Sequence, residues 1–125
     1  MRRDAIEQAL LLDYYGELLT RKQRLYCDLY CNQDYSLSEI AEETGISRQG
    51  VHDALLHAEA ALLEFERILG CAERDRRVRR QAGAARKALA PLLAHPDEAV
   101  RDGARRAAEL ISTIEADAGA SAEEL

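Results

Sequence analysis

Four polar residues that follow a glycine turn have side chains able to recognise nucleic-acid bases: Ser47, Arg48, Gln49 and His52. Arginine pairs with guanine and glutamine with adenine, so these residue types at the start of a helix fit contacts to base edges. Arg48 is the one permanent cation among them, and Asp53 lies beside it. We therefore expect weak, non-specific binding at physiological salt. The alternative is a solvated helix start that binds nothing.

A second group of candidates is a run of arginines that begins shortly after residue 70. On a helix these arginines cover most of the face that small apolar residues leave free, and Arg86 and Lys87 extend the run. Arginine clusters bind RNA phosphates and stack on bases. The alternative is neutralisation by the acidic residues Glu59, Glu64 and Glu66 just upstream. The nucleic-acid candidates in this run are Arg74, Arg76, Arg77, Arg79 and Arg80.

Metal binding and catalysis have little support in the sequence. Cys27 and Cys31 lie one helical turn apart, but the sequence contains no C-x2-C pair and no H-x3-H pair, which zinc sites commonly use. Cysteines at this spacing are more often buried small apolar groups. There is no glycine-rich phosphate loop, and no Ser or Cys stands with a base and an orienting residue. We expect no metal, no cofactor and no enzymatic activity.

The elements that would position Ser47 to His52 are two helices within residues 36–55. Ser36 and Glu39 form the S-x-x-E pattern of a capping box, which starts a helix. Gly45 stands where the turn requires a positive φ angle, and Ser47 is suited to cap the second helix. This order of signals predicts a helix-turn-helix, a module whose second helix usually enters the major groove of DNA.

Composition predicts an all-α protein. The 125 residues are 47% hydrophobic, are rich in Ala and Leu, and include only two prolines. An odd number of cysteines and the lack of a signal or membrane segment favour reduced thiols and a cytoplasmic location. We expect a first helix over about 4–19 and a second that Thr20 caps and that ends near Asn32. The expected buried face of the first helix is Ile6, Leu10, Leu11, Tyr14 and Leu18.

The second helix of the helix-turn-helix pair is predicted to be unusually long, because apolar residues continue along it at spacings of 4 and 3 up to Gly70. This is a heptad pattern of nearly three repeats, which requires a partner surface. A second copy of the chain is the expected partner, and the C-terminal helices of the same chain are the alternative. The predicted dimer seam is Val51, Leu55, Ala58, Leu62, Phe65 and Leu69.

The chain is expected to divide at residue 70 into a helix-turn-helix domain (1–70) and an Arg/Ala-rich helical appendage with an acidic tail (71–125). Residues 1–70 carry seven basic and thirteen acidic residues, whereas residues 71–90 carry seven basic and two acidic ones. Apolar residues at helical spacing predict a helix after Cys71. Pro91 and Pro96 bracket a break, after which a last helix over about 96–117 completes a C-terminal hairpin.

Three segments of the sequence together resemble the YlxM family of small bacterial helix-turn-helix proteins. They are LLDYYGELLTRKQRLYCDLY, DYSLSEIAEETGISRQGVHDAL and EAALLEFERILG, which span about residues 8–70. The T-x-K-Q-R, D-Y-S-L-x-E-I-A-E and S-R-Q-x-V motifs are specific in combination. The same stretch is similar to the fourth region of bacterial sigma factors, so the resemblance implies a sigma-region-4-like bundle.

The YlxM resemblance implies a regulatory or adaptor protein of the signal recognition particle pathway. Such a protein would bind the RNA of the particle, its GTPase, or both. Two alternatives stay open at this point. One is a sigma-like transcriptional regulator that binds duplex DNA. The other is an interaction module for proteins alone, which the acidic balance of residues 1–70 favours.

Overall fold

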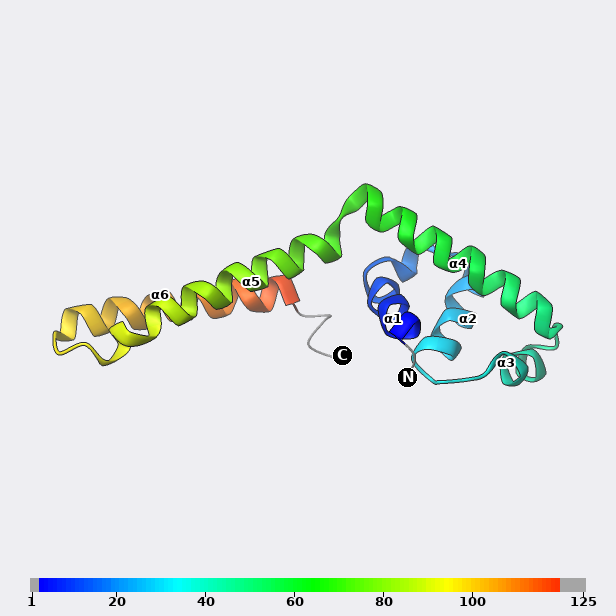
Figure 1. Ribbon diagram of the computed structural model, residues 1–125, viewed down its shortest axis with the longest axis horizontal. Helices are drawn as coiled ribbons and strands as arrows, with labels where there is room; N and C mark the ends of the chain where they lie inside the picture. Colours follow the sequence, from blue (N-terminus) through cyan, green and yellow to red (C-terminus); the bar gives the residue numbers. More distant parts are fainter. Residues whose placement is uncertain (1–2, 120–125) are drawn as a thin grey trace. The chain divides into compact units, whose positions relative to one another are not determined.

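The computed structural model describes residues 3–119, with side chains from Ala5 onward. Within this range the chain forms six α-helices, two short 3-10 helices and no strand, so the predicted all-α class is confirmed (Figure 1). The α-helices are α1 (Arg3–Tyr15), α2 (Arg21–Cys31), α3 (Leu37–Thr44), α4 (Arg48–Leu69), α5 (Cys71–Leu89) and α6 (Glu98–Gly119); the 3-10 helices are η1 (Gly16–Leu18) and η2 (Ala90–Ala94).

The helix starts follow the predicted capping signals. Thr20 accepts a hydrogen bond from the backbone N–H of Gln23, whose side chain accepts one from the N–H of Thr20. Ser36 and Glu39 make the same reciprocal pair at the start of α3. Each box satisfies two backbone donors that a helix start leaves without partners.

The first helix ends earlier than predicted. α1 stops at Tyr15, and η1 continues to Leu18 in place of the predicted α-helical turns to residue 19. Thr20 must be extended to cap α2, so the chain has to leave the helix before it. Gly16 allows a close approach at this point, because a Cβ atom there would lie 3.2 Å from Cδ1 of Leu12.

The predicted buried face of α1 is only partly correct: Leu11 and Tyr14 pack against the core, but the most buried residues lie one position away from the predicted ones. Ile6 and Leu18 are 51% and 56% exposed, and Leu10, Leu11 and Tyr14 are only partly buried. Small residues explain the shift: two alanines of α1 pack against the fully buried Cys31 of α2. The face that is buried consists of Ala5, Ala9, Leu12 and Tyr15.

The assignment of the α4 stripe to a dimer seam is also corrected by the structure. α4 packs against α1, α2 and α3, and the stripe supplies the centre of that core (Figure 1). Phe65 is partly buried against the core, and Leu69 is 50% exposed. The residues that lie within the chain's own core, and so are not available to a second copy, are Val51, Leu55, Ala58 and Leu62.

Tyr15 and Glu66 connect α1 to the junction between α4 and α5. Gly70 caps the C-terminus of α4 in a left-handed conformation with φ 62°. The Tyr15 hydroxyl donates to Oε1 of Glu66 at 2.5 Å and accepts from the N–H of Cys71 at 3.0 Å. The same Glu66 oxygen accepts from the N–H of Ala72 at 3.1 Å. Two free donors at the start of α5 are thereby satisfied.

The chain separates into two compact units, residues 1–72 and residues 73–125. In the second unit, α6 begins at Glu98 instead of the predicted residue 96, and Asp97 accepts from the N–H of Ala99 at its start. Arg86 of α5 donates to Oγ of Ser112 at 3.0 Å and pairs with Glu115 of α6. The long side chain of Arg86 thus links α5 to α6 within the hairpin.

Candidate nucleic-acid interface

α3 and α4 have the local geometry of a helix-turn-helix. Gly45 closes α3 in the left-handed conformation (φ 76°), and its N–H donates to the carbonyl of Ala41 at 2.9 Å. Ser47 then caps α4 by accepting from the N–H of Gly50 at 3.0 Å. Ile40 and Val51 are fully buried where the two helices pack together. The predicted turn and both predicted caps are confirmed.

The start of α4 presents the four predicted side chains to solvent, but not all of them are free. Nε2 of Gln49 donates to Oδ1 of Asp53 at 2.9 Å. Nδ1 of His52 lies 3.8 Å from the same oxygen. Arg48 is exposed and makes no ion pair with any residue in the described range. Arg48 is therefore the side chain most accessible to a phosphate or a base edge.

The five arginines predicted on α5 fall into three groups. Arg76 and Arg80 both form ion pairs with the carboxylate of Glu73, with N···O distances of 3.1 Å and 3.5 Å. Arg79 turns toward α6, where it lies against Gly119, and its Nε donates to the carbonyl of Asp75 at 3.4 Å. The two that are exposed and form no ion pair within residues 3–119 are Arg74 and Arg77. The accessible positive charge of α5 is smaller than the sequence indicates.

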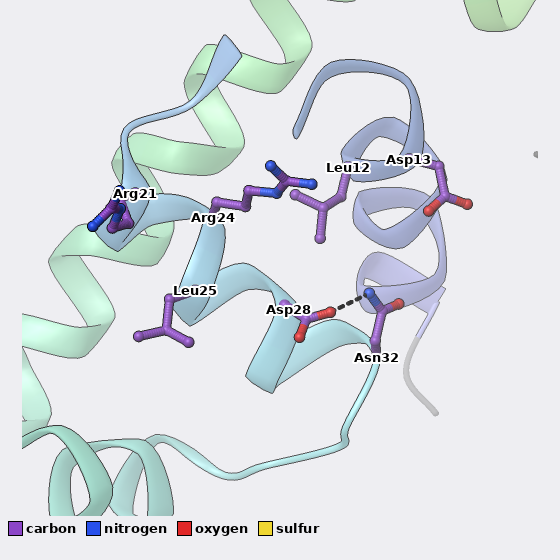
Figure 2. Close-up of a pocket in the computed structure, with 7 residues that line it drawn as sticks. All are labelled: Leu12, Asp13, Arg21, Arg24, Leu25, Asp28 and Asn32. Carbon is purple, nitrogen blue, oxygen red and sulfur yellow. Dashed lines mark hydrogen bonds between the residues drawn. The ribbon is translucent and has the colours of Figure 1, made fainter. Parts of the chain in front are cut away.

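A cationic site that the sequence analysis missed lies at the start of α2. Arg21, Lys22 and Arg24 are all exposed, and two of them line an open pocket of about 470 Å³ between α1 and α2 (Figure 2). The signal for it was present in the T-R-K-Q-R segment, which has three cations in four positions. By its pattern the segment predicts a helix start and matches a family motif, and neither of these indicates a binding site.

The cysteines lie in the core and at the α4–α5 junction. Cys27 and Cys31 are fully buried, and Cys71 is partly exposed. Burial, with a smaller contribution from the Glu59 carboxylate, raises the pKa of the Cys27 thiol from 9.0 to about 11. Among the described residues, no three His, Cys, Asp or Glu side chains are grouped as metal ligands would be. None of the described helices combines the length and apolar character that a membrane span requires.

A sequence model of the UPF0122 family, described as "Putative helix-turn-helix protein, YlxM / p13 like", matches residues 3–82. The match therefore includes all of the helix-turn-helix unit and continues into α5. No solved structure matches the chain.

Curated relatives carry the same family name. A UPF0122 protein of Symbiobacterium thermophilum is 43% identical over 104 residues, which cover 74% of this chain and 97% of that protein. A UPF0122 protein of Acetivibrio thermocellus is 56% identical over 64 residues, or 51% of this chain, and the chain spans about half (55%) of that relative's length. A relative from Clostridium kluyveri is 47% identical over 75 residues, which cover 60% of this chain and 68% of the relative.

Proposed function

The chain belongs to the UPF0122 family of YlxM/p13-like helix-turn-helix proteins, and we propose that it is a non-enzymatic regulator that binds nucleic acid through the first turns of α4. The observation that carries this proposal is the exposed start of α4, which the turn at Gly45 and the cap at Ser47 hold above a buried core. Backbone N–H groups and the positive end of the helix dipole face outward there.

The partner in this proposal is the RNA of the signal recognition particle, its GTPase, or both, in the cytoplasm. The family resemblance supports this choice. Charge supports a modest affinity: residues 1–70 carry a formal net charge of −6, and electrostatic attraction to phosphates is the main source of non-specific binding. A protein of this kind would depend on a few specific contacts more than on bulk charge.

The Arg48→Ala variant tests the proposal directly. Loss of one charged contact to a base edge or phosphate costs about 1–3 kcal/mol, so we expect roughly 5- to 150-fold weaker binding to the particle's RNA in a fluorescence anisotropy titration at low salt. The matched control is Arg67→Ala, which removes another exposed arginine of α4 that is already paired with Glu64 at 2.5 Å. Its affinity should equal that of the wild type.

One result would contradict the proposed binding to nucleic acid, and a second would then show which partner remains. Wild-type protein that binds neither RNA nor duplex DNA at low salt would remove nucleic acid as the partner. Retention of the particle's GTPase at high salt by such a protein would identify it as a module for protein contacts alone.

A sigma-like DNA-binding regulator is the second candidate function. Arg48 and Gln49 support it, since both are exposed at the positions of a recognition helix that normally meet base edges. This candidate requires a defined duplex site, which a genomic pull-down would recover as an enriched sequence motif. A pull-down that yields RNA, or DNA without a common motif, favours the first candidate.

We also propose that two copies of the chain pair through the outward face of α4. Leu56 and Leu63 lie one heptad apart on this face and are 50% and 54% exposed. Leu63 lines a small pocket with residues of α1, and Leu56 lines a second pocket with residues of α1, α2 and α3. The two pockets share Gln8 and Glu59. An exposed apolar stripe of this kind is typical of an interface.

The expected result is that a Leu56→Ser/Leu63→Ser variant sediments as a folded monomer, whereas the wild type sediments as a dimer. Ile68→Ser, which alters another exposed apolar residue of α4 (62% exposed), should leave the dimer intact. A wild type that sediments as a monomer at concentrations of tens of micromolar would rule out the pairing.

A further inference from the structure

The start of α2 gathers positive charge in a unit that is otherwise acidic. Arg21, Lys22 and Arg24 make up three of the seven Lys and Arg residues in 1–70, and all three side chains are exposed. They also stand in the first turns of the helix, where the dipole is positive. The capping box occupies the backbone N–H groups of Thr20 and Gln23, which leaves fewer backbone donors for an anion at this helix start.

Arg24 borders an open pocket between α1 and α2. In Figure 2 its side chain extends across toward Leu12 of α1, whereas the side chain of Arg21 points away from it. The Arg24 side chain passes close to Gly16, where a Cβ atom would be in ordinary van der Waals contact with Nε of Arg24 at 3.7 Å. The two guanidinium groups therefore diverge and do not converge on one point.

Acidic residues nearby in the described part of the chain form no ion pair with these cations. Asp28 lines the same pocket, but its two carboxylate oxygens accept hydrogen bonds from Nδ2 of Asn32 (2.8 Å) and Nε2 of Gln33 (2.9 Å). Asp13 points away from Arg24 in Figure 2. Within residues 3–119 neither Arg21, Lys22 nor Arg24 forms an ion pair, in contrast to Arg67, Arg76, Arg80 and Arg105.

We infer that Arg21, Lys22 and Arg24 bind successive phosphates of a nucleic-acid strand, which gives the first unit a backbone contact separate from the start of α4. The inference rests on the proposed function. Guanidinium groups match the geometry of phosphate oxygens and bind them in a bidentate manner. Because the side chains diverge, one phosphate ion cannot engage all three, whereas a strand with regularly spaced phosphates can. Such contacts position a partner and carry no sequence information.

The experiment measures how binding depends on salt. Each phosphate contact contributes about 0.7 to the slope of log K against log salt for single strands, and about 0.9 for duplex DNA. We expect the Arg21→Gln/Lys22→Gln/Arg24→Gln variant to lower that slope by roughly 2 to 3 for a labelled 20-nucleotide RNA or a 20-base-pair duplex. The matched control is Arg67→Gln, whose arginine is paired with Glu64, and it should leave the slope unchanged.

The outcomes separate this inference from the proposed function. If Arg48→Ala weakens binding and the triple variant retains the wild-type slope, the α2 contact is overturned and the proposed function stands. If the wild type binds neither the RNA nor the duplex, the α2 contact and the proposed binding of nucleic acid are both overturned. Saturable binding of inorganic phosphate at millimolar concentration, observed as amide NMR shifts at Arg21 and Arg24, would identify a site for a free anion and overturn the strand contact.

Folding of the variants is checked by circular dichroism. Should the triple variant unfold, the single variants Arg21→Gln and Lys22→Gln, at two exposed positions, provide the same measurement. Each is expected to lower the slope by about 0.7 to 0.9. A slope unchanged in both would overturn the inference.

Discussion

At protein concentrations low enough for the chain to be monomeric, Leu62→Ala is expected to lower the free energy of unfolding by about 2–5 kcal/mol, whereas Leu63→Ala should change it by less than about 1 kcal/mol. The two substitutions remove the same atoms from adjacent positions of α4. Leu62 is fully buried in the core of the first unit, and Leu63 is 54% exposed. Truncation of Leu62 leaves a cavity as well as a loss of buried apolar surface.

Urea denaturation followed by circular dichroism checks this prediction. Because a domain of this size is stable by only about 5–15 kcal/mol, the Leu62 variant should show a clearly lower midpoint. Equal midpoints for the two variants would mean that Leu62 is not in the core. A Leu62 variant that keeps its stability and changes from dimer to monomer would restore the predicted seam.

The first unit is expected to lose stability between about pH 9 and pH 11. The pKa of the buried Cys27 thiol is raised from 9.0 to about 11, so the unfolded chain releases this proton before the folded chain does. The stabilising contribution is complete below pH 9 and is lost as pH rises to 11. Its full size is on the order of 2–3 kcal/mol.

The Cys27→Ala variant isolates this contribution. Its free energy of unfolding should fall less steeply over this pH range than that of the wild type, measured by urea denaturation at successive pH values. Cys71→Ala removes a partly buried thiol and is the matched control up to about pH 10; above that pH it also removes a Cys71 side-chain hydrogen bond that helps to raise the pKa of Tyr15. Burial and the Glu66 carboxylate also raise the pKa of Tyr15, so both variants retain a further decline above pH 10. Identical slopes in the wild type and the Cys27 variant would contradict the prediction.

Local signals in the sequence predicted much of the fold, because they act over three or four residues. The capping boxes at Thr20 and Ser36 and the turns at Gly45 and Gly70 depend only on neighbouring backbone groups. Burial was predicted less well, because it depends on what packs across from a helix. Large apolar residues indicated a face of α1 one position away from the most buried one, where alanines allow a close approach to Cys31.

The partner of the α4 stripe could not be predicted for a similar reason. A heptad pattern specifies an apolar surface that must be covered, and a second copy or neighbouring helices of the same chain satisfy it equally. Three short helices cover Val51, Leu55 and Leu62 here. The predicted intrachain alternative, the C-terminal helices, is wrong, because α1, α2 and α3 pack on the stripe.

Side-chain pairing limited the prediction of the candidate site. The pattern identified Gln49, Arg76 and Arg79 as exposed polar residues of a helix, but it did not indicate their partners. Asp53 engages Gln49, Glu73 engages Arg76, and Arg79 turns toward α6. Conversely, the pattern of the α2 cations predicts only a helix start, because the pocket beside them forms only when α1 and α2 pack together.

Asp53 has a consequence for how such a regulator is distributed in a cell. Chromosomal DNA offers on the order of a million or more competing sites, and a strongly basic recognition helix would leave most molecules sequestered on them. A carboxylate that holds Gln49 and lies near His52 makes brief, unproductive encounters less favourable. Under the proposed function, this arrangement would keep the free pool large and would favour a target that offers enough contacts to displace the Asp53–Gln49 hydrogen bond.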